Sequence, residues 1–163
     1  DLAECLTKIA DNIKIIVYGG GDQLELLRNK VADKGLENIV FKGRVDKEYI
    51  PFILSKSDLN LMDGDIGGLS KYGISGNKLF DYIASGRPII MDCEENEFGI
   101  INKNQIGIAK PFGSSREMAE TIADMLNGDE KRYELWCNNA RALAMEFDFK
   151  RLTDKLIEII ENK

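Results

Sequence analysis

The sequence contains no histidine among its 163 residues. Histidine is the side chain that most readily changes its charge near neutral pH, and it serves as a general base in catalytic triads and as a metal ligand. Its absence excludes those chemistries. Basic residues are also in the minority, because 22 lysines and arginines face 28 acids and leave a net charge of −6. A protein that binds along a nucleic-acid backbone needs a basic surface, so we expect no nucleic-acid partner.

Cysteines are few, and long apolar runs and an initiator methionine are missing. The three cysteines are scattered and lack the spacing of a metal site, which is typical of a reducing cytoplasm. No apolar run approaches the length of a membrane span, and the start at Asp1 does not resemble a signal peptide. Because the first residue is not methionine, we expect the chain to be a piece of a longer protein. The 44% apolar and 31% charged residues are typical of a soluble globular domain.

Apolar strand-like runs alternate with amphipathic helical patterns along the chain. Strands are predicted at 13–18, 38–41, 59–62, 88–91 and 106–109. Helices are predicted from Asp22 to Gly35, at 46–56, at 77–85, from Ser114 or Ser115 to 127, at 130–145 and at 150–162. This alternation predicts an α/β fold, a Rossmann-like parallel sheet with helices on both faces and extra helices at the C-terminus. We expect residues 1–163 to form a single domain.

Several loops that follow the predicted strands contain glycine or polar residues. They lie at 19–22, 43–45, 63–76 and 92–97. Because ligands bind beyond the carboxyl ends of parallel strands, we expect these loops to gather at one edge of the sheet. The 63–76 loop is long for such a domain, and long loops inside compact domains are usually functional.

The most informative segment runs from 73 to 90 and combines a glycine-bearing loop, a short helix, a tight turn and a buried strand. Small residues at a helix start leave backbone N–H groups free to bind a phosphate. Lys78 adds a positive charge, and Ser75 or Asn77 adds a hydrogen bond. Asp81, one turn later, suits the hydroxyl groups of a ribose. The segment predicts a nucleotide pocket; the alternatives are that Ser75 or Asn77 only caps the helix and that Lys78 faces water or pairs with Asp81.

Other candidate residues give weaker signals. The Gly19-Gly20-Gly21 run permits close approach of a ligand, and Arg44 suits stacking on a base, although both segments also fit an ordinary turn and a solvated arginine. Asp63 and Asp65 offer two carboxylates for a metal. The acidic run at 94–97 is typical of a solvated loop. Residues expected to pack helices into the core are Trp136, Phe147 and Phe149.

Together these segments resemble the C-terminal, donor-binding half of a GT-B glycosyltransferase, and glycosyltransferase family 4 in particular. The order of landmarks agrees over nearly the whole chain, and the landmarks are 15–22, 38–45, 57–61, 77–88, Gly107, and Phe147 with Phe149. The most specific part is the run Gly76-Asn77-Lys78-Leu79-Phe80-Asp81-Tyr82. It resembles a Pro-Ser/Asn-Lys-Leu-Phe-Glu-Tyr pattern found in bacterial enzymes that build cell-surface polysaccharides.

The resemblance implies transfer of a hexose or acetamidosugar from a nucleoside diphosphate sugar. The expected nucleotide is UDP. The implied acceptor is a polysaccharide, lipid-linked or glycan hydroxyl, and the implied reaction retains the anomeric configuration without a metal or other cofactor. The implied roles of the site residues are the ribose contact for Asp81, the diphosphate contact for Ser75, Gly76, Asn77 and Lys78, the base contact for Arg44 and Val45, and general contact with the nucleotide-sugar for Gly20 and Gly21. No catalytic residue is identified.

Three departures from the family pattern affect these expectations. Gly73 and Asp81 stand where many members have two glutamates, so the usual contact to the donor sugar is not expected to be the same here. Gly76 replaces a proline. The family's arginine and lysine after its first strand have no counterpart here, and we expect a separate N-terminal acceptor domain as the partner of this chain. The 163 residues alone are therefore expected to bind a nucleotide weakly and not to catalyse transfer.

Two alternatives stay open. A GT-B-fold sugar-nucleotide epimerase relies on histidine and further acids near the donor, and this chain has no histidine. A receiver-like or ligand-binding module would use Asp63 as its phosphorylated residue, but Gly19-Gly20-Gly21 occupies the place of the acidic cluster that a receiver needs. For the whole enzyme we expect a cytoplasmic location, which allows peripheral association with the inner face of the membrane.

Overall fold

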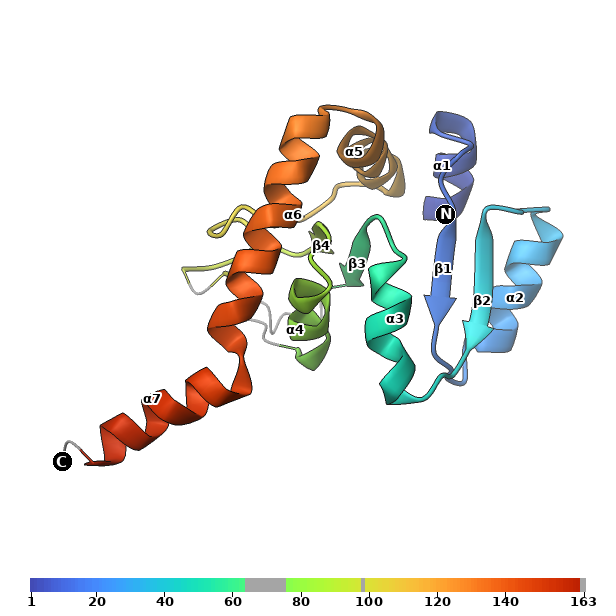
Figure 1. The fold of residues 1–163 in the computed structure, drawn as a ribbon. Helices are drawn as coiled ribbons and strands as arrows, with labels where there is room; N and C mark the ends of the chain where they lie inside the picture. The colour runs from blue at the N-terminus through green and yellow to red at the C-terminus, as the bar shows by residue number, and fades with distance from the viewer. Residues whose placement is uncertain (64–75, 98, 162–163) are drawn as a thin grey trace. The chain divides into compact units, whose positions relative to one another are not determined.

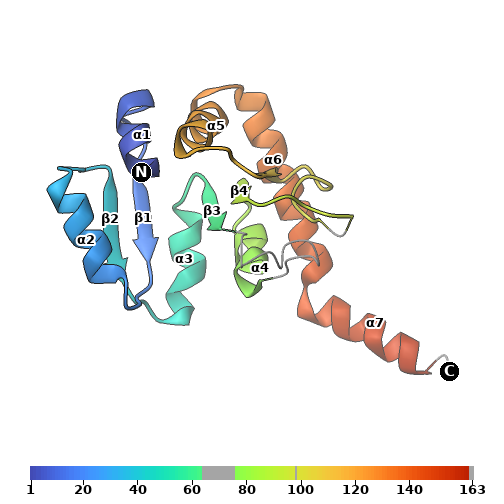
Figure 2. The same cartoon turned by 180° about the vertical axis from the view of Figure 1, so that it is seen from behind.

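The computed structural model describes residues 1–63, 76–97 and 99–161 (Figures 1 and 2). These residues divide into two compact units. Unit 1 comprises Asp1–Ile50 and Phe112–Asp129, and unit 2 comprises Pro51–Pro111 and Glu130–Lys163. Each unit has its own parallel sheet and its own buried residues, and each is described by itself.

Unit 1 combines a two-stranded parallel sheet with a packed pair of helices. Its strands pair in register from Ile15 opposite Ile39, with a bulge near Tyr18. The side chains of Leu6 and Ala119, one on each of the two paired helices, are fully buried. The elements are α1 (Leu2–Ile9), β1 (Ile15–Tyr18), α2 (Leu24–Asp33), β2 (Ile39–Gly43), η1 (Lys47–Tyr49) and α5 (Ser115–Asn127), of which α1 and α5 form the pair.

Unit 2 has a three-stranded parallel sheet in the order β3-β4-β5. The three strands start level with one another, since Asn60 pairs with Ile89 and Ile89 pairs with Gly107. At Gly107 a side chain would collide with the Ile89 carbonyl, so the close pairing of β4 and β5 requires glycine. The elements are α3 (Ile50–Ser55), β3 (Asn60–Asp63), α4 (Asn77–Ala84), β4 (Ile89–Asp92), β5 (Gly107–Lys110), α6 (Glu130–Ala144), η3 (Met145–Phe147) and α7 (Phe149–Glu161).

The parallel α/β class that the sequence predicts is confirmed, and the five predicted strands and the predicted helices are present within two or three residues of their expected bounds. Two details differ. The strands form two sheets rather than one. In the described part of the chain, β1 and β2 pair only with each other, and β3, β4 and β5 pair in that order. The second helix begins at Leu24 rather than at Asp22, since Gln23 occupies the cap position and gives no side-chain hydrogen bond to the helix.

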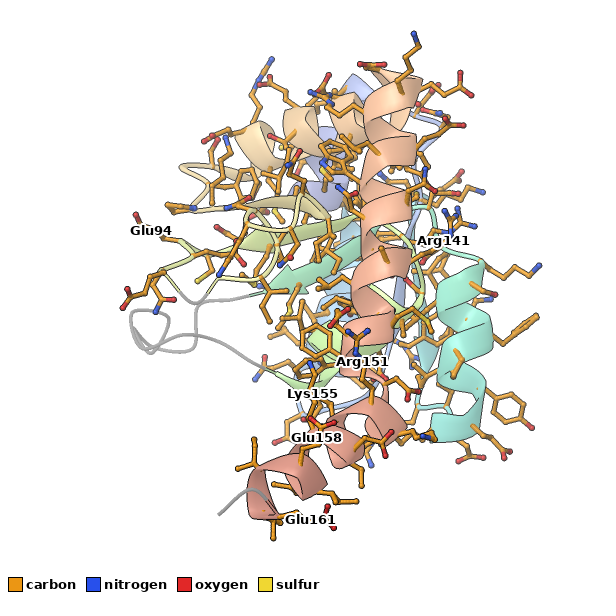
Figure 3. All side chains as sticks on the ribbon, turned by 60° about the vertical axis from the view of Figure 1, so that its left-hand side comes forward. Glu94, Arg141, Arg151, Lys155, Glu158 and Glu161 are labelled. Carbon is orange, nitrogen blue, oxygen red and sulfur yellow. The ribbon has the colours of Figure 1, made fainter. Side chains whose placement is uncertain are left out.

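The aromatic residues near the C-terminus divide into buried and exposed ones. Trp136 is buried on α6, and the ring of Phe147 meets the ring of Phe80 edge-on with 5.0 Å between centroids. The expectation that Phe149 packs into the core is wrong, because 87% of its surface is exposed. Phe149 is the first residue of α7, whose main contact is with η3. Figure 3 shows α7 leaving the end of α6 at an angle, with Glu161 on its last turn.

No helix in the described ranges combines the length and the apolar composition that a membrane span requires.

Candidate functional site

The N-terminal turn of α4 is the best-defined part of the candidate site. The cap position is held by Gly76, whose carbonyl accepts a hydrogen bond from the Leu79 N–H at 2.9 Å. The N–H groups of Asn77 and Lys78 have no acceptor among the residues that the structure describes. No acidic residue occupies this first turn. Within the described part of the chain, the turn therefore presents N–H groups without acceptors at the positive end of the helix dipole, where an anion is stabilised.

The two faces of α4 have opposite characters. Leu79 and Ile83 are almost completely buried in the core of unit 2. Asn77, Lys78 and Asp81 are exposed. This division follows from the 3.6-residue helical period, which places positions 79 and 83 on one side and positions 77, 78 and 81 away from it. The core contact fixes which face of α4 is presented to a ligand.

Lys78 and Asp81 do not form the ion pair that one alternative reading of the sequence predicts. Neither side chain makes a hydrogen bond or ion pair within the described residues. The predicted cap residues also need correction, because Asn77 is already the first helical residue and Gly76 is the cap. Ser75 lies outside the described residues. With respect to the residues that the structure describes, both charged groups of the exposed face are therefore available to a ligand.

Tyr82 connects α4 to the neighbouring strand. Its hydroxyl group donates a hydrogen bond of 3.4 Å to the carbonyl of Leu61 on β3. Burial raises the pKa of Tyr82, and the neighbouring negative charge of Asp81 raises it further. The phenol therefore stays protonated and remains a donor at physiological pH.

In unit 1 the structure brings together two of the predicted site residues, Gly20 and Arg44. The loops that carry them are joined by a hydrogen bond of 2.7 Å from the Gly19 N–H to the Gly43 carbonyl. The Arg44 side chain then runs along the Gly20 backbone, so that a Cβ atom at position 20 would lie 3.1 Å from Arg44 Nε. Gly19 and Gly43 both have positive φ angles, of 134° and 76°, which glycine adopts without strain.

The remaining predicted residues of unit 1 are open to a ligand. Nothing lies within 4 Å of a Cβ atom at Gly21, and Val45 is 36% exposed. Arg44 is exposed and forms no ion pair within the described part of the chain. These residues form a surface at the carboxyl ends of β1 and β2, which is where a parallel sheet binds ligands.

The predicted site residues are distributed over both units. Gly20, Gly21, Arg44 and Val45 belong to unit 1, and Gly76, Asn77, Lys78 and Asp81 belong to unit 2. The expectation that all of them gather at one edge stays a prediction. Asp65, one of the two carboxylates considered for a metal, lies outside the described residues, as do Gly73 and Ser75.

One acidic residue after β4 has a structural role that the sequence did not reveal. The carboxylate of Glu95 is half-buried and accepts hydrogen bonds from the N–H groups of Ile101 and Asn102, each at 2.7 Å. A side chain at Gly99 would collide with Glu95, so glycine there permits the turn. The signal for this role was weak, because the acid lies in a run of acids that is typical of a solvated loop.

Comparison with known proteins identifies the group to which this arrangement belongs. The chain is 24% identical over 151 residues to a phosphatidyl-myo-inositol mannosyltransferase of Mycobacterium leprae, covering 93% of this chain and 38% of that protein. It is 27% identical over 155 residues to an uncharacterized glycosyltransferase of Methanocaldococcus jannaschii, covering 94% of this chain and 38% of that protein. The chain thus spans about two fifths of the length of these curated relatives.

Solved structures show the same fold. Anabaena HepE in complex with UDP-glucose superposes with a TM-score of 0.75 at 20% identity, over 99% of this chain and 44% of that one. A TarM variant of S. aureus in complex with UDP superposes with a TM-score of 0.72 at 18% identity, over 96% of this chain and 31% of that one. The family described as glycosyl transferases group 1 matches residues 2–143. The chain therefore belongs to the group 1 glycosyltransferase family and has the α/β fold that these GT-B glycosyltransferase structures share over the aligned part.

Proposed function

We propose that this chain binds the donor of a glycosyltransferase, a nucleoside diphosphate sugar whose base is uracil. The observation that carries the proposal is the first turn of α4. Gly76 caps the helix there, the Asn77 and Lys78 N–H groups have no acceptor within the described part, and the turn itself contains no acidic residue. A diphosphate suits this turn because it is anionic and accepts several hydrogen bonds.

Each exposed residue of α4 has a role in this proposal. The N–H groups at Asn77 and Lys78 bind the diphosphate, and the Lys78 ammonium group neutralises part of its charge. When the bond between the sugar C1 and the diphosphate oxygen breaks, the electron pair moves to the diphosphate. Fixed donors and a positive charge at that position stabilise the growing negative charge. Asp81, one turn further on, accepts hydrogen bonds from the ribose hydroxyl groups.

The base of the donor and the acceptor are proposed to bind to other parts of the protein. Arg44 and Val45 are proposed to contact the base, with Gly20 and Gly21 leaving room for the donor. Uracil is favoured because structures with this fold hold UDP or UDP-glucose. The proposed acceptor is a hydroxyl of a glycan or lipid-linked molecule, in keeping with the phosphatidyl-myo-inositol and kanosaminyl activities for which two relatives are named. We further propose an acceptor domain beyond this chain, retention at C1, no metal, and a cytoplasmic location.

The proposal is tested by titrating the isotope-labelled full-length protein with UDP, GDP and ADP in parallel. Expected are chemical shift changes at 76–81 and at Arg44 and Val45 for UDP, and unchanged affinity in the presence of EDTA. The donor sugar is then found by assaying UDP-sugars for turnover, and the anomeric configuration of the product tests retention. No shift at 76–81 with any of the three nucleotides would overturn the proposal.

A further inference from the structure

The C-terminal end of α4 is anchored by a buried polar residue, Asn60, which is the first residue of β3. Only 4% of its surface is exposed. Its backbone N–H donates to the Pro88 carbonyl at 3.0 Å and so belongs to the sheet. Burial of an amide side chain is unfavourable unless its donors and acceptors are paired. The hydrogen-bond partners of the Asn60 side chain therefore indicate which parts of the fold this buried residue holds together.

Those contacts run from β3 to the end of α4. The Asn60 Nδ2 group donates to the Ser85 hydroxyl at 2.9 Å, and Ser57 donates to Asn60 Oδ1 at 3.0 Å. The Ser85 hydroxyl donates to the Tyr82 carbonyl at 2.6 Å and accepts from the Arg87 N–H at 3.3 Å. Since Ser85 is the C-cap residue of α4, one asparagine connects the start of the strand to the last turn of the helix.

A second contact holds the same turn from another direction. Gly86, which follows Ser85, has a positive φ of 65°, and a Cβ atom there would lie 2.7 Å from Arg141 Cγ on α6. Figure 3 shows Arg141 along the length of α6. The turn after α4 thus lies between β3, to which it is hydrogen-bonded, and the closely packed Arg141 side chain of α6. These two contacts fix the position of the turn.

The anchor and the anion-binding turn lie at opposite ends of one short helix. From Asn77 to Ser85 the chain advances eight residues, which corresponds to about 12 Å at the rise of an α-helix. Leu79 and Ile83 hold α4 on the core by apolar contact, which is not directional and tolerates small movements along the helix axis. Hydrogen bonds have strict geometry, so the Asn60–Ser85 contact at 2.9 Å constrains the axial position of α4 more tightly than the longer Tyr82–Leu61 hydrogen bond of 3.4 Å does.

We propose that Asn60 and Ser85 are positioning residues for donor binding: together they fix the axial position of α4 and hence the place of the N–H groups of Asn77 and Lys78. This inference rests on the proposed function. Neither residue is expected to touch the nucleotide-sugar, because both lie at the other end of α4. A set of N–H groups that is held in place in advance binds an anion more tightly than a set that must be ordered on binding.

The test compares the variants Asn60→Ala and Ser85→Ala in the full-length protein. The matched control is Asn38→Ala. Asn38 is also buried, at 7% exposure, and its Nδ2 group donates to the Ala3 carbonyl at 2.7 Å within unit 1, whereas α4 belongs to unit 2. Two quantities are measured for each variant: hydrogen exchange of the α4 amides, and the dissociation constant of UDP. Ser85→Ala removes a single hydroxyl group, so it remains informative where Asn60→Ala fails to fold.

The expected result is specific to α4. Loss of either partner should speed exchange of the α4 amides and raise the UDP dissociation constant by about tenfold, a change that one net hydrogen bond of about 1.4 kcal/mol accounts for. Asn38→Ala should change neither quantity by more than about twofold, and Ser85→Thr, which keeps the hydroxyl, should retain parental values.

The outcomes separate this inference from the proposed function. If the parent protein binds UDP but both anchor variants leave α4 exchange and UDP affinity unchanged, the positioning role is overturned and the proposed function stands. An equal loss of affinity in Asn38→Ala would also overturn it, since the effect would then be general destabilisation. If the parent protein binds no UDP, the proposed function fails and the inference with it.

Discussion

Replacement of Lys78 by glutamine should weaken UDP binding without weakening the fold. A hydrogen bond to a charged group contributes about 1.5–3 kcal/mol, which corresponds to roughly 10- to 150-fold in a dissociation constant. Lys78 is exposed on α4, so solvent screens its interaction with a diphosphate. We therefore expect the lower end of this range, about tenfold.

The effect of the same change on stability should be zero or favourable. Lys78 occupies the first turn of α4 and makes no ion pair or hydrogen bond within the described residues. A positive charge near a helix N-terminus is unfavourable by about 0.3–1 kcal/mol. Removing it should therefore raise the melting temperature of unliganded protein by up to about 3 °C for a chain of this size.

Calorimetric titration with UDP at low and high salt, together with thermal unfolding, measures both effects. Glutamine should reduce the salt dependence of binding, because one charge contact is lost, whereas Lys78→Arg should keep it. The reasoning is refuted if Lys78→Gln binds UDP as tightly as the parent protein. A melting temperature lowered by several degrees would equally refute it, since that would reveal a structural role for Lys78 in the fold.

Three further predictions concern other residues. Asp81→Ala should abolish discrimination between UDP and 2′-deoxy-UDP in a binding titration; a discrimination equal to that of the parent would refute the ribose contact. Gly107→Ala should lower the free energy of unfolding by about 3 kcal/mol in a denaturant titration, because the new Cβ atom collides with the Ile89 carbonyl. Hydrogen bonds from Lys34 and then Lys8 lower the pKa of Glu4 from its ordinary 4.5 to about 2. Its stabilising contribution is therefore complete above pH 4.5 and is lost as the pH falls toward 2; a Glu4→Gln variant with an unchanged acid-unfolding profile would contradict this.

The sequence alone was sufficient for most of the local structure, although α1 was not predicted. Branched apolar runs bounded by glycine and polar residues predicted the strands, and the helical period predicted α4 at 77–85 against the observed Asn77–Ala84. Such patterns succeed because strand and helix formation depend on neighbouring residues and on which face is apolar. The free first turn of α4 was predictable for the same reason, since small and polar residues at a helix start act within one turn.

Contacts between distant residues were decided only by the tertiary structure. Phe147 and Phe149 have the same side chain two positions apart, yet Phe147 packs on Phe80 while Phe149 is exposed on α7. The Asn60–Ser85 hydrogen bond joins residues 25 positions apart. No local pattern contains this information, because burial and pairing depend on which segment the folded chain brings alongside. The sequence by itself determined the elements and the chemistry of the anion-binding turn, and the tertiary structure determined how that turn is held in place.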